Sequence, residues 1–178
     1  MNRLKGQRVY LAGPIDRVKD KGKVWREDVT PFLESMGIEV FNPVNKPSHV
    51  GVENDATHRI KKKLKNNEKY DELSEMMKII RTVDLRLVDL SDFLIVSLDL
   101  NVHMCGTLEE LFLANRQKKP ILVWVRQGKR HAPDWLFGTI PHEMIFNSWK
   151  EIQEYLEYIN TAESLENCLS RWCFFNVA

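Results

Sequence analysis

The most reactive group that the sequence offers is a carboxylate near the start of a predicted helix over residues 107–117. Gly106 precedes Thr107, and Glu110 follows three residues later in the pattern S/T-x-x-E. This spacing favours a capping box, which stabilises a helix start by about 1 kcal/mol. It also fits a carboxylate kept ionised by the positive end of the helix dipole, the form that a nucleophile toward a sugar needs. The adjacent Glu109 is an alternative for the exposed carboxylate.

The elements that must position this carboxylate alternate between strands and helices. Short apolar runs predict strands at residues 9–12, 38–41, 93–96, 121–125 and 144–146. Helical spacing of apolar residues predicts helices at residues 24–36, 72–90, 107–117 and 149–159. Alternating elements of this kind indicate an α/β fold with a doubly wound sheet of about five parallel strands, flanked by helices.

The chain length of 178 residues fits a single domain over residues 1–178. Residues 44–70 interrupt the alternation and include a basic stretch at 58–65, which indicates either a solvated insertion or a lid over a site. The tail at 161–178 either contacts a neighbouring subunit or folds back on its own domain, because exposed aromatic groups normally need burial. Its aromatic residues are Trp172, Phe174 and Phe175.

The composition is that of a globular protein, with 43% hydrophobic and 29% charged residues. With 26 basic and 25 acidic side chains the net charge is +1, which disfavours polynucleotide or membrane partners and favours a small molecule. Cys105, Cys168 and Cys173 show no metal-binding spacing, so we expect no metal and reduced thiols in a cytoplasmic protein. Residues 1–9 contain no recognisable leader, and apolar runs are shorter than the ~20 residues of a membrane span.

In a sheet of this kind, ligands bind beyond the carboxyl ends of the strands. Three segments follow predicted strands at this edge: residues 13–16, 99–106 and 126–140. Together with the helix start they supply the candidate substrate-binding residues, which are Gly13, Pro14, Asp16, Asp99, Asn101, Gly106 and Thr107.

Three short motifs occur in a characteristic order along residues 8–160. They are Val9-Tyr10-Leu11-Ala12-Gly13-Pro14, then Asp84 with Asp92 opening an apolar strand, and then Gly106-Thr107-x-x-Glu110-x-x-x-Ala114. In this order and on these predicted elements, the sequence resembles the nucleoside 2-deoxyribosyltransferase family, which includes related nucleotide N-glycosidases. The resemblance implies a flavodoxin-like fold, no cofactor and a homo-oligomer.

The resemblance also implies roles for three catalytic residues. Glu110 would attack the anomeric carbon of the sugar, Tyr10 would orient Glu110, and Asp84 would help to protonate the leaving base. The plain alternatives are a core tyrosine at position 10 and, at position 84, a surface charge paired with Arg81 or Arg86. Asp92 lies at the far end of its strand, so we expect it to be structural.

The sequence departs from the family pattern at two positions, Met104 and Phe112. Six residues before Glu110, family members carry an acidic residue for a 5′-hydroxyl or a serine for a 5′-phosphate, and Met104 replaces either. The 5′ group of the substrate is therefore left open. The leading hypothesis from the resemblance is a transferase that moves deoxyribose between nucleobases. The alternatives are a nucleoside 5′-monophosphate N-glycosidase, with Ser97 as a phosphate-side candidate, and a non-catalytic nucleotide-binding module.

Overall fold

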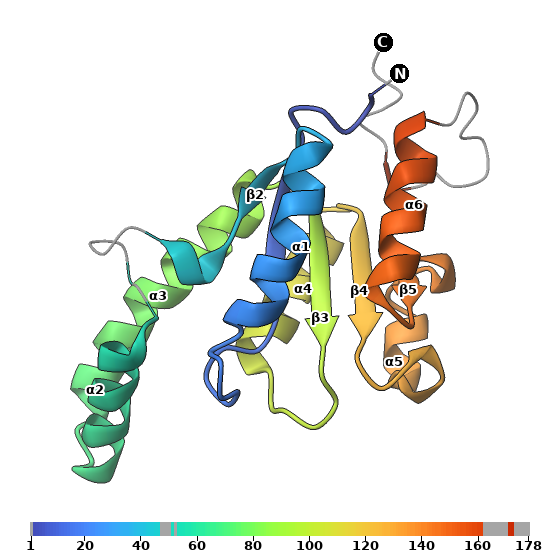
Figure 1. Ribbon diagram of the computed structural model, residues 1–178. Helices are drawn as coiled ribbons and strands as arrows, with labels where there is room; N and C mark the ends of the chain where they lie inside the picture. Colours follow the sequence, from blue (N-terminus) through green and yellow to red (C-terminus); the bar gives the residue numbers. More distant parts are fainter. Residues whose placement is uncertain (1, 47–50, 52, 162–170, 173–178) are drawn as a thin grey trace.

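The computed structural model describes residues 2–46, 51, 53–161 and 171–172, and a parallel five-stranded sheet runs through its centre (Figure 1). The strands lie in the order β2-β1-β3-β4-β5. Their bounds are Arg8–Ala12 (β1), Glu39–Phe41 (β2), Phe93–Leu98 (β3), Ile121–Val125 (β4) and Ile145–Phe146 (β5). This is the strand order of flavodoxin-like folds and confirms the predicted α/β class.

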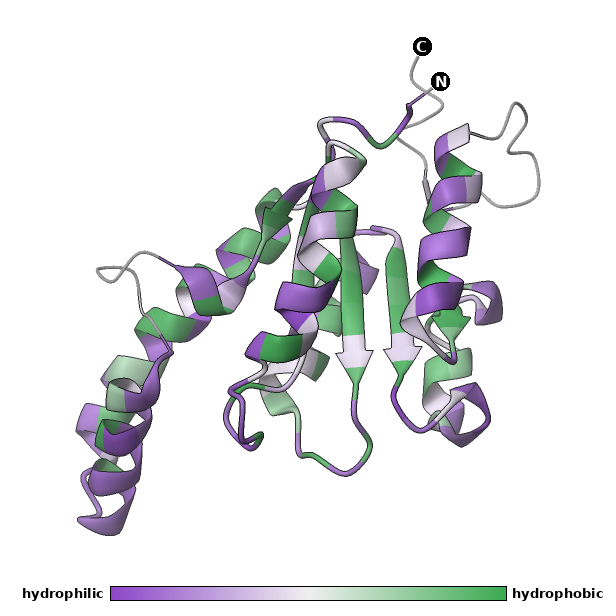
Figure 2. Cartoon of the chain, in the orientation of Figure 1, coloured by the Kyte–Doolittle hydropathy of each residue, from purple (hydrophilic) through white to green (hydrophobic). Residues whose placement is uncertain are grey.

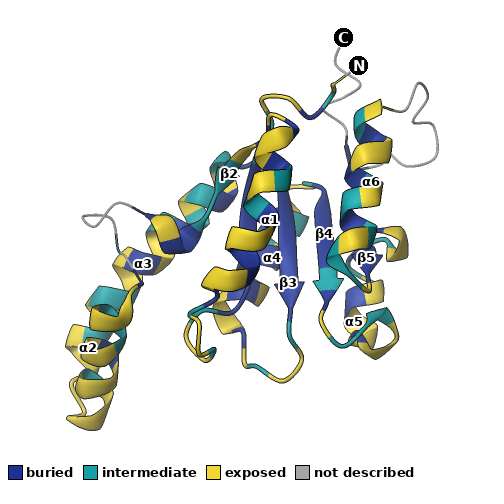
Figure 3. Cartoon of the chain, viewed as in Figure 1, coloured by how far each residue is buried: buried dark blue, intermediate teal, exposed yellow. Residues whose placement is uncertain are grey.

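Helices cover both faces of the sheet, as expected for strands that are apolar along their whole length. β3 is buried at every residue (Figure 3). On one face lie α1 (Lys23–Ser35) and α6 (Trp149–Thr161), and on the other lie α3 (Tyr70–Leu90) and α4 (Cys105–Arg116) (Figure 1). The apolar positions concentrate on the sheet and on the helix surfaces that contact it (Figure 2).

The start of α4 differs from the prediction. The helix begins at Cys105, because the backbone N–H of Leu108 donates to the carbonyl oxygen of Met104 at 2.9 Å. No side chain caps the helix, and Thr107 lies buried within the first turn. The predicted capping box between Thr107 and Glu110 is therefore wrong, since the helix starts two residues earlier and frees Glu110 for another contact.

The segment predicted as an insertion contains two helical elements that the sequence analysis missed. They are a short 3-10 helix, Pro43–Asn45, and α2, Asp55–Asn66. Asn54 and Thr57 form a capping box at the start of α2. α2 packs beside α3, and the pair extends away from the sheet with mostly polar, exposed surfaces (Figures 1–3). Most of this surface agrees with the prediction of a solvated insertion.

Two sets of contacts join distant segments at the edge of the sheet where the strands begin. The Asp92 carboxylate accepts hydrogen bonds from the backbone N–H of Arg8 at 2.7 Å and from its guanidinium at 3.0 and 3.1 Å, so Asp92 is structural, as expected. Trp172 is fully buried, packs against Phe93 with ring centroids 5.2 Å apart and the rings tilted by 50°, and donates to the Tyr155 hydroxyl. This part of the tail folds back on its own domain, whereas Phe174 and Phe175 lie outside the described residues.

The loop after β4 carries three short helical elements that the sequence analysis did not predict. They are Lys129–His131, α5 (Asp134–Phe137) and His142–Met144. Across the described part of the chain, no helix combines the length and apolar character needed to span a membrane.

Replacing Trp172 by alanine tests the attachment of the tail. The side chain is fully buried, so we expect Trp172→Ala to lower the free energy of unfolding by about 3–5 kcal/mol in denaturant titrations. Trp135→Ala is the matched control, because Trp135 is 80% exposed and its loss should change stability by roughly 0.5 kcal/mol or less. Equal effects of the two substitutions would contradict the observed burial.

Candidate active site

A buried tyrosine–glutamate pair lies on the face of the sheet that α3 and α4 cover. Tyr10 projects from β1 and is fully buried, and its hydroxyl donates to Oε1 of Glu110 on α4 at 2.7 Å. Only 9% of the surface of Glu110 is exposed. The neighbouring Glu109 instead points outward and pairs with Arg81. The structure therefore selects Glu110 as the buried carboxyl and joins two residues that are 100 positions apart.

Burial dominates the ionisation of Glu110. Loss of hydration raises the pKa of its carboxyl to about 8, the Tyr10 hydrogen bond opposes this rise, and the negative charge of Asp84 reinforces it. The expectation that the helix dipole keeps Glu110 ionised is therefore wrong for the free protein, because desolvation outweighs the favourable contacts. Burial also raises the pKa of Tyr10 well above its ordinary value, so its hydroxyl stays protonated and remains a donor.

Asp84 lies on α3 and is also buried. Its Oδ1 accepts a hydrogen bond from Nζ of Lys46 at 2.6 Å, so the alternative of a surface pair with Arg81 or Arg86 is wrong. Burial raises the pKa of Asp84 to about 6, although the charge of Lys46 opposes the rise. Asp84 thus titrates near neutrality, in the range in which a carboxyl can pass a proton to a leaving group.

A second ion cluster, in which Lys61 and Glu53 are buried and Asp16 is exposed, connects α2 to the loop after β1. Nζ of Lys61 on α2 donates to Oε1 of Glu53 at 2.9 Å and to Oδ1 of Asp16 at 2.5 Å, and Nδ1 of His58 lies 3.4 Å from Asp16. Burial alone would lower the pKa of Lys61, but its bonds to Asp16 and Glu53 outweigh burial and raise it. The negative charge of Glu53 also raises the pKa of Glu110, which links this cluster electrostatically to the site.

Arg26 is a fully buried cation on α1. Its guanidinium donates to the carbonyl oxygens of Leu11 at 3.1 Å, Gly13 at 3.0 Å and Gly22 at 2.7 Å, which fixes the turn between β1 and α1. Burial lowers the pKa of Arg26 to about 10, so it remains charged at neutral pH, and its charge lowers the pKa of Glu110. It therefore stabilises both the turn and the ionised form of the carboxyl.

Sequence analysis missed four of these ionisable residues. One signal was available for Arg26, because it interrupts the apolar stripe that Val29 and Leu33 continue on the same helix. The pairings of the others join distant segments and leave no spacing pattern. They are Lys46, Glu53 and Lys61.

The predicted substrate-binding residues lie in different environments and do not form one cluster. Asn101 and Gly106 are exposed beyond β3 and at the start of α4, respectively. Gly13 has a packing role, because a Cβ there would lie 2.8 Å from Cζ2 of Trp25. Pro14 and Asp99 line a cavity of about 490 Å³ on the opposite face of the sheet. Among the described residues, no cluster of three or more His, Cys, Asp or Glu is placed to hold a metal ion.

Comparison with known proteins shows which solved structures have a similar fold. No protein-family model matches the sequence, and no curated protein matches it. The structure is similar to a 2-deoxyribosyltransferase from Bacillus psychrosaccharolyticus, with a TM-score of 0.56 and 17% identity over 83% of this chain and 91% of the other. It is also similar to a 2-deoxyribosyltransferase from Leishmania mexicana, with a TM-score of 0.53 and 16% identity over 85% of this chain and 98% of the other. The chain therefore has the fold of these enzymes.

Replacing Glu110 by glutamine tests the protonation of the buried carboxyl. The folded-state pKa of about 8 lies above the ordinary 4.5, so the folded protein holds this proton more tightly than the unfolded chain. Stability should therefore fall as pH rises from about 4.5 to about 8, by on the order of 1 kcal/mol per pH unit at most. Glu110→Gln keeps an acceptor for Tyr10 and removes this titration.

We expect the unfolding free energy of Glu110→Gln to exceed that of the wild type increasingly between pH 5 and pH 8, on the order of one to a few kcal/mol at the upper end. Denaturant titrations at several pH values measure the difference. Glu109→Gln is the matched control, since that exposed carboxylate has a lowered pKa from its hydrogen bonds to Arg81. A constant difference between wild type and Glu110→Gln across this range would show that Glu110 is ionised in the fold.

Proposed function

We propose that this protein is a nucleoside 2-deoxyribosyltransferase that cleaves the N-glycosidic bond of a 2′-deoxynucleoside and transfers the sugar to another nucleobase. The observation that carries the proposal is the buried Glu110 carboxyl, held by the Tyr10 hydroxyl at 2.7 Å beside the buried Asp84. A protein that only stabilises its fold gains nothing from burying two carboxyls on one face of a sheet. The fold similarity to 2-deoxyribosyltransferases supports the assignment.

In the proposed first step, an oxygen of ionised Glu110 attacks C1′ of the sugar. The C1′–N bond breaks, and its electron pair leaves with the base. The step also requires an oriented and ionised carboxylate. The Tyr10 hydroxyl supplies both, because its hydrogen bond to Oε1 fixes the carboxylate and favours the ionised form. The product is a glycosyl ester of Glu110 and a free base.

Asp84 is the proposed proton donor to the departing base. Its pKa of about 6 leaves part of the population protonated near neutrality, and Lys46 holds the carboxyl in place. In the second step a nitrogen of an incoming base attacks C1′ and its proton passes to the Asp84 carboxylate, while the ester bond breaks and the Glu110 carboxylate is restored. Attack by water instead releases free deoxyribose.

The low polarity around Glu110 favours the transition state of this chemistry. Charge develops on the sugar ring as the glycosidic bond breaks, and a carboxylate in a poorly hydrated site stabilises that charge more strongly than one in water. As positive charge develops at C1′, it lowers the pKa of Glu110. The carboxyl can then lose its proton at a pH at which it stays protonated in the free protein.

One observation favours the alternative of a nucleoside 5′-monophosphate N-glycosidase. No side chain caps α4, and Gly106 at its exposed start meets no neighbour within 4 Å of a Cβ position. Unpaired N–H groups at a helix start bind phosphate well. Asp16, Asn101, Gly106 and Thr107 remain the proposed substrate contacts in either reaction.

We further propose that a single domain spanning residues 1–178 carries out this reaction as a cytoplasmic homo-oligomer. Its partners would be small molecules, a nucleoside or nucleotide and a free base, and neither a metal nor a redox cofactor is required by the steps above. The net charge of +1 supports a small-molecule partner over a polynucleotide.

Chromatographic product analysis tests the reaction. Deoxynucleosides and their 5′-monophosphates are incubated with and without a second base. We expect a new nucleoside only with the second base, and a loss of at least about a thousandfold in rate for Glu110→Ala. Glu109→Gln is the control and should retain activity, because Glu109 is directed away from the pair.

Each other product pattern has a distinct meaning. Free base released from monophosphates without an acceptor would support the N-glycosidase. No turnover of any compound, or turnover unchanged in Glu110→Ala, would exclude Glu110 as the nucleophile and favour a binding module.

The pH dependence of the rate tests the role of Tyr10. The nucleophile must be ionised and Asp84 must be protonated, so kcat/KM of the wild type should rise with pH up to about 6, stay level, and fall above about 8. Tyr10→Phe removes the hydrogen bond that lowers the pKa of Glu110, so its profile should shift to higher pH and its rate should fall by about ten- to a hundredfold. A slower variant with an unshifted profile would assign Tyr10 a packing role alone.

A further inference from the structure

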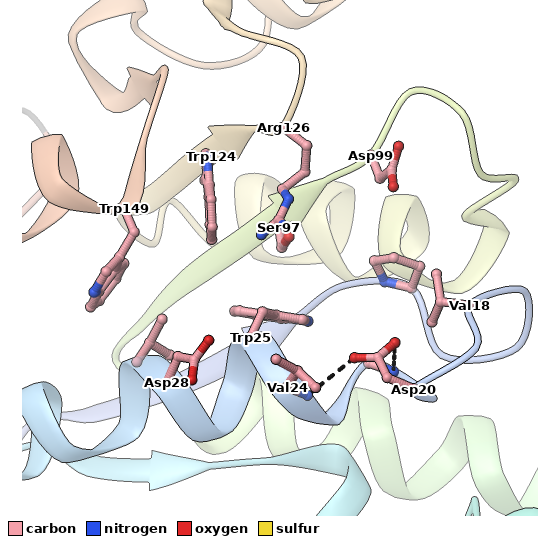
Figure 4. Close-up of a pocket in the computed structure, with 13 residues that line it drawn as sticks. Val18, Asp20, Val24, Trp25, Asp28, Ser97, Asp99, Trp124, Arg126 and Trp149 are labelled. Carbon is pink, nitrogen blue, oxygen red and sulfur yellow. Dashed lines mark hydrogen bonds between the residues drawn. The ribbon is translucent and has the colours of Figure 1, made fainter.

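The cavity of about 490 Å³ lies on the face of the sheet opposite to Glu110, between α1 and α6 (Figure 4). Strand alternation separates the two sites. Tyr10 is paired with Leu94, so Ser97, three residues further along β3, projects to the other face, and its partner Trp124 on β4 projects with it. The volume is within the range of small-molecule sites, which is roughly 300–1,000 Å³.

The walls of this cavity combine aromatic rings with carboxylates. Tryptophans and aspartates dominate the lining: Trp25, Trp124, Trp149, Asp20, Asp28 and Asp99. Arg126 is the only basic side chain among the described lining residues. Its guanidinium lies 4.0 Å from the ring centroid of Trp124, which is a cation–π contact. One tryptophan ring of the cavity thus already binds a cation, the guanidinium of Arg126.

Trp25 lines the cavity, and its ring packs against the Arg26 side chain. The guanidinium of Arg26 lies 4.6 Å from its ring centroid, and Gly13 leaves room for its edge. The residue is 8% exposed, and its indole N–H has no hydrogen-bond partner within the described part of the chain. An unpaired buried donor is unfavourable for stability, so on a cavity wall it is more typical of a ligand site, where a hydroxyl oxygen such as that of choline can accept from it.

Asp28 supplies a carboxylate without an internal partner. Asp20 accepts hydrogen bonds from the backbone of Gly22 and Val24, and Asp99 accepts one from Gln127. The Asp28 side chain, by contrast, is exposed to solvent and makes no hydrogen bond or ion pair with the rest of the described chain, and it lies on the helix face beside Trp25 (Figure 4). An unpaired carboxylate next to tryptophan faces is a suitable counter-charge for an ammonium group.

We propose that this cavity is a second binding site, which takes a small organic cation of the alkylammonium or quaternary ammonium class. Among the described lining residues, three acidic side chains against one basic side chain give the cavity a negative balance. The rings of Trp25 and Trp124 already have a guanidinium on one face, so the cation would contact Trp149 and the remaining ring faces. The site is separate from the Glu110 site and does not depend on the function proposed there.

Titration of the purified protein with choline and with 3,3-dimethylbutan-1-ol, its uncharged isostere, tests the proposal. Isothermal calorimetry supplies the affinity, and quenching of tryptophan fluorescence supplies an independent signal. We expect saturable binding of choline that is at least about tenfold tighter than binding of the alcohol, because only the cation gains the aromatic and carboxylate contacts. Equal affinities, or no saturable binding of choline, would overturn the proposal.

Variants locate the bound cation. Asp28→Asn and Trp149→Leu should each weaken choline binding by about fivefold or more, with circular dichroism confirming the fold. Glu27→Gln on α1 and Trp135→Leu on α5 are the matched controls and should bind as the wild type does, because both residues are exposed and neither lines the cavity. Unchanged binding in both cavity variants would overturn the assignment.

Glu110→Gln separates this inference from the proposed enzyme activity. Choline should bind this variant with the affinity of the wild type, because the cavity and Glu110 lie on opposite faces of the sheet. Loss of binding in Glu110→Gln would place the cation in the Glu110 site and would contradict a second site.

Discussion

The structure depends on compensating the charge of acidic groups that are buried on one side of the sheet. Glu110, Asp84 and Glu53 are all removed from water there, and each would be strongly unfavourable without partners. Lys46 pairs with Asp84, Lys61 pairs with Glu53, and the charge of Arg26 reaches all three. Glu110 alone receives a neutral donor, the Tyr10 hydroxyl, in place of a direct cation.

Burial is the main cause of the raised pKa of Glu110, and the absence of a direct cation explains why this pKa stays higher than that of Asp84, which Lys46 lowers. A salt bridge would hold the carboxylate ionised and would also block it from a ligand. A phenol orients the same oxygen and leaves the group able to respond to a positive centre in the substrate. The arrangement lowers stability at neutral and higher pH, and such destabilisation is common where a fold maintains a reactive group.

The period-two alternation of the strands places the Glu110 pair and the cavity on opposite faces of the sheet. Along β1, Tyr10 faces α4 and the buried acids, while the turn that follows contacts Trp25 and the cavity between α1 and α6. Arg26 lies between these regions, since it binds the carbonyl oxygens at the end of β1 and stacks on Trp25. One buried side chain thus holds the turn that borders both sites.

The sequence by itself determined the fold class, because strand and helix periodicity is a local pattern and predicted the five strands. Tyr10, Asp84 and Glu110 were singled out by the resemblance to the 2-deoxyribosyltransferase family, and their catalytic roles remain proposals. Only the tertiary structure decided which of Glu109 and Glu110 is buried, that Asp84 pairs with Lys46, and that α4 starts at Cys105. These outcomes depend on desolvation and on contacts between distant segments, and neither leaves a periodic signal in the chain.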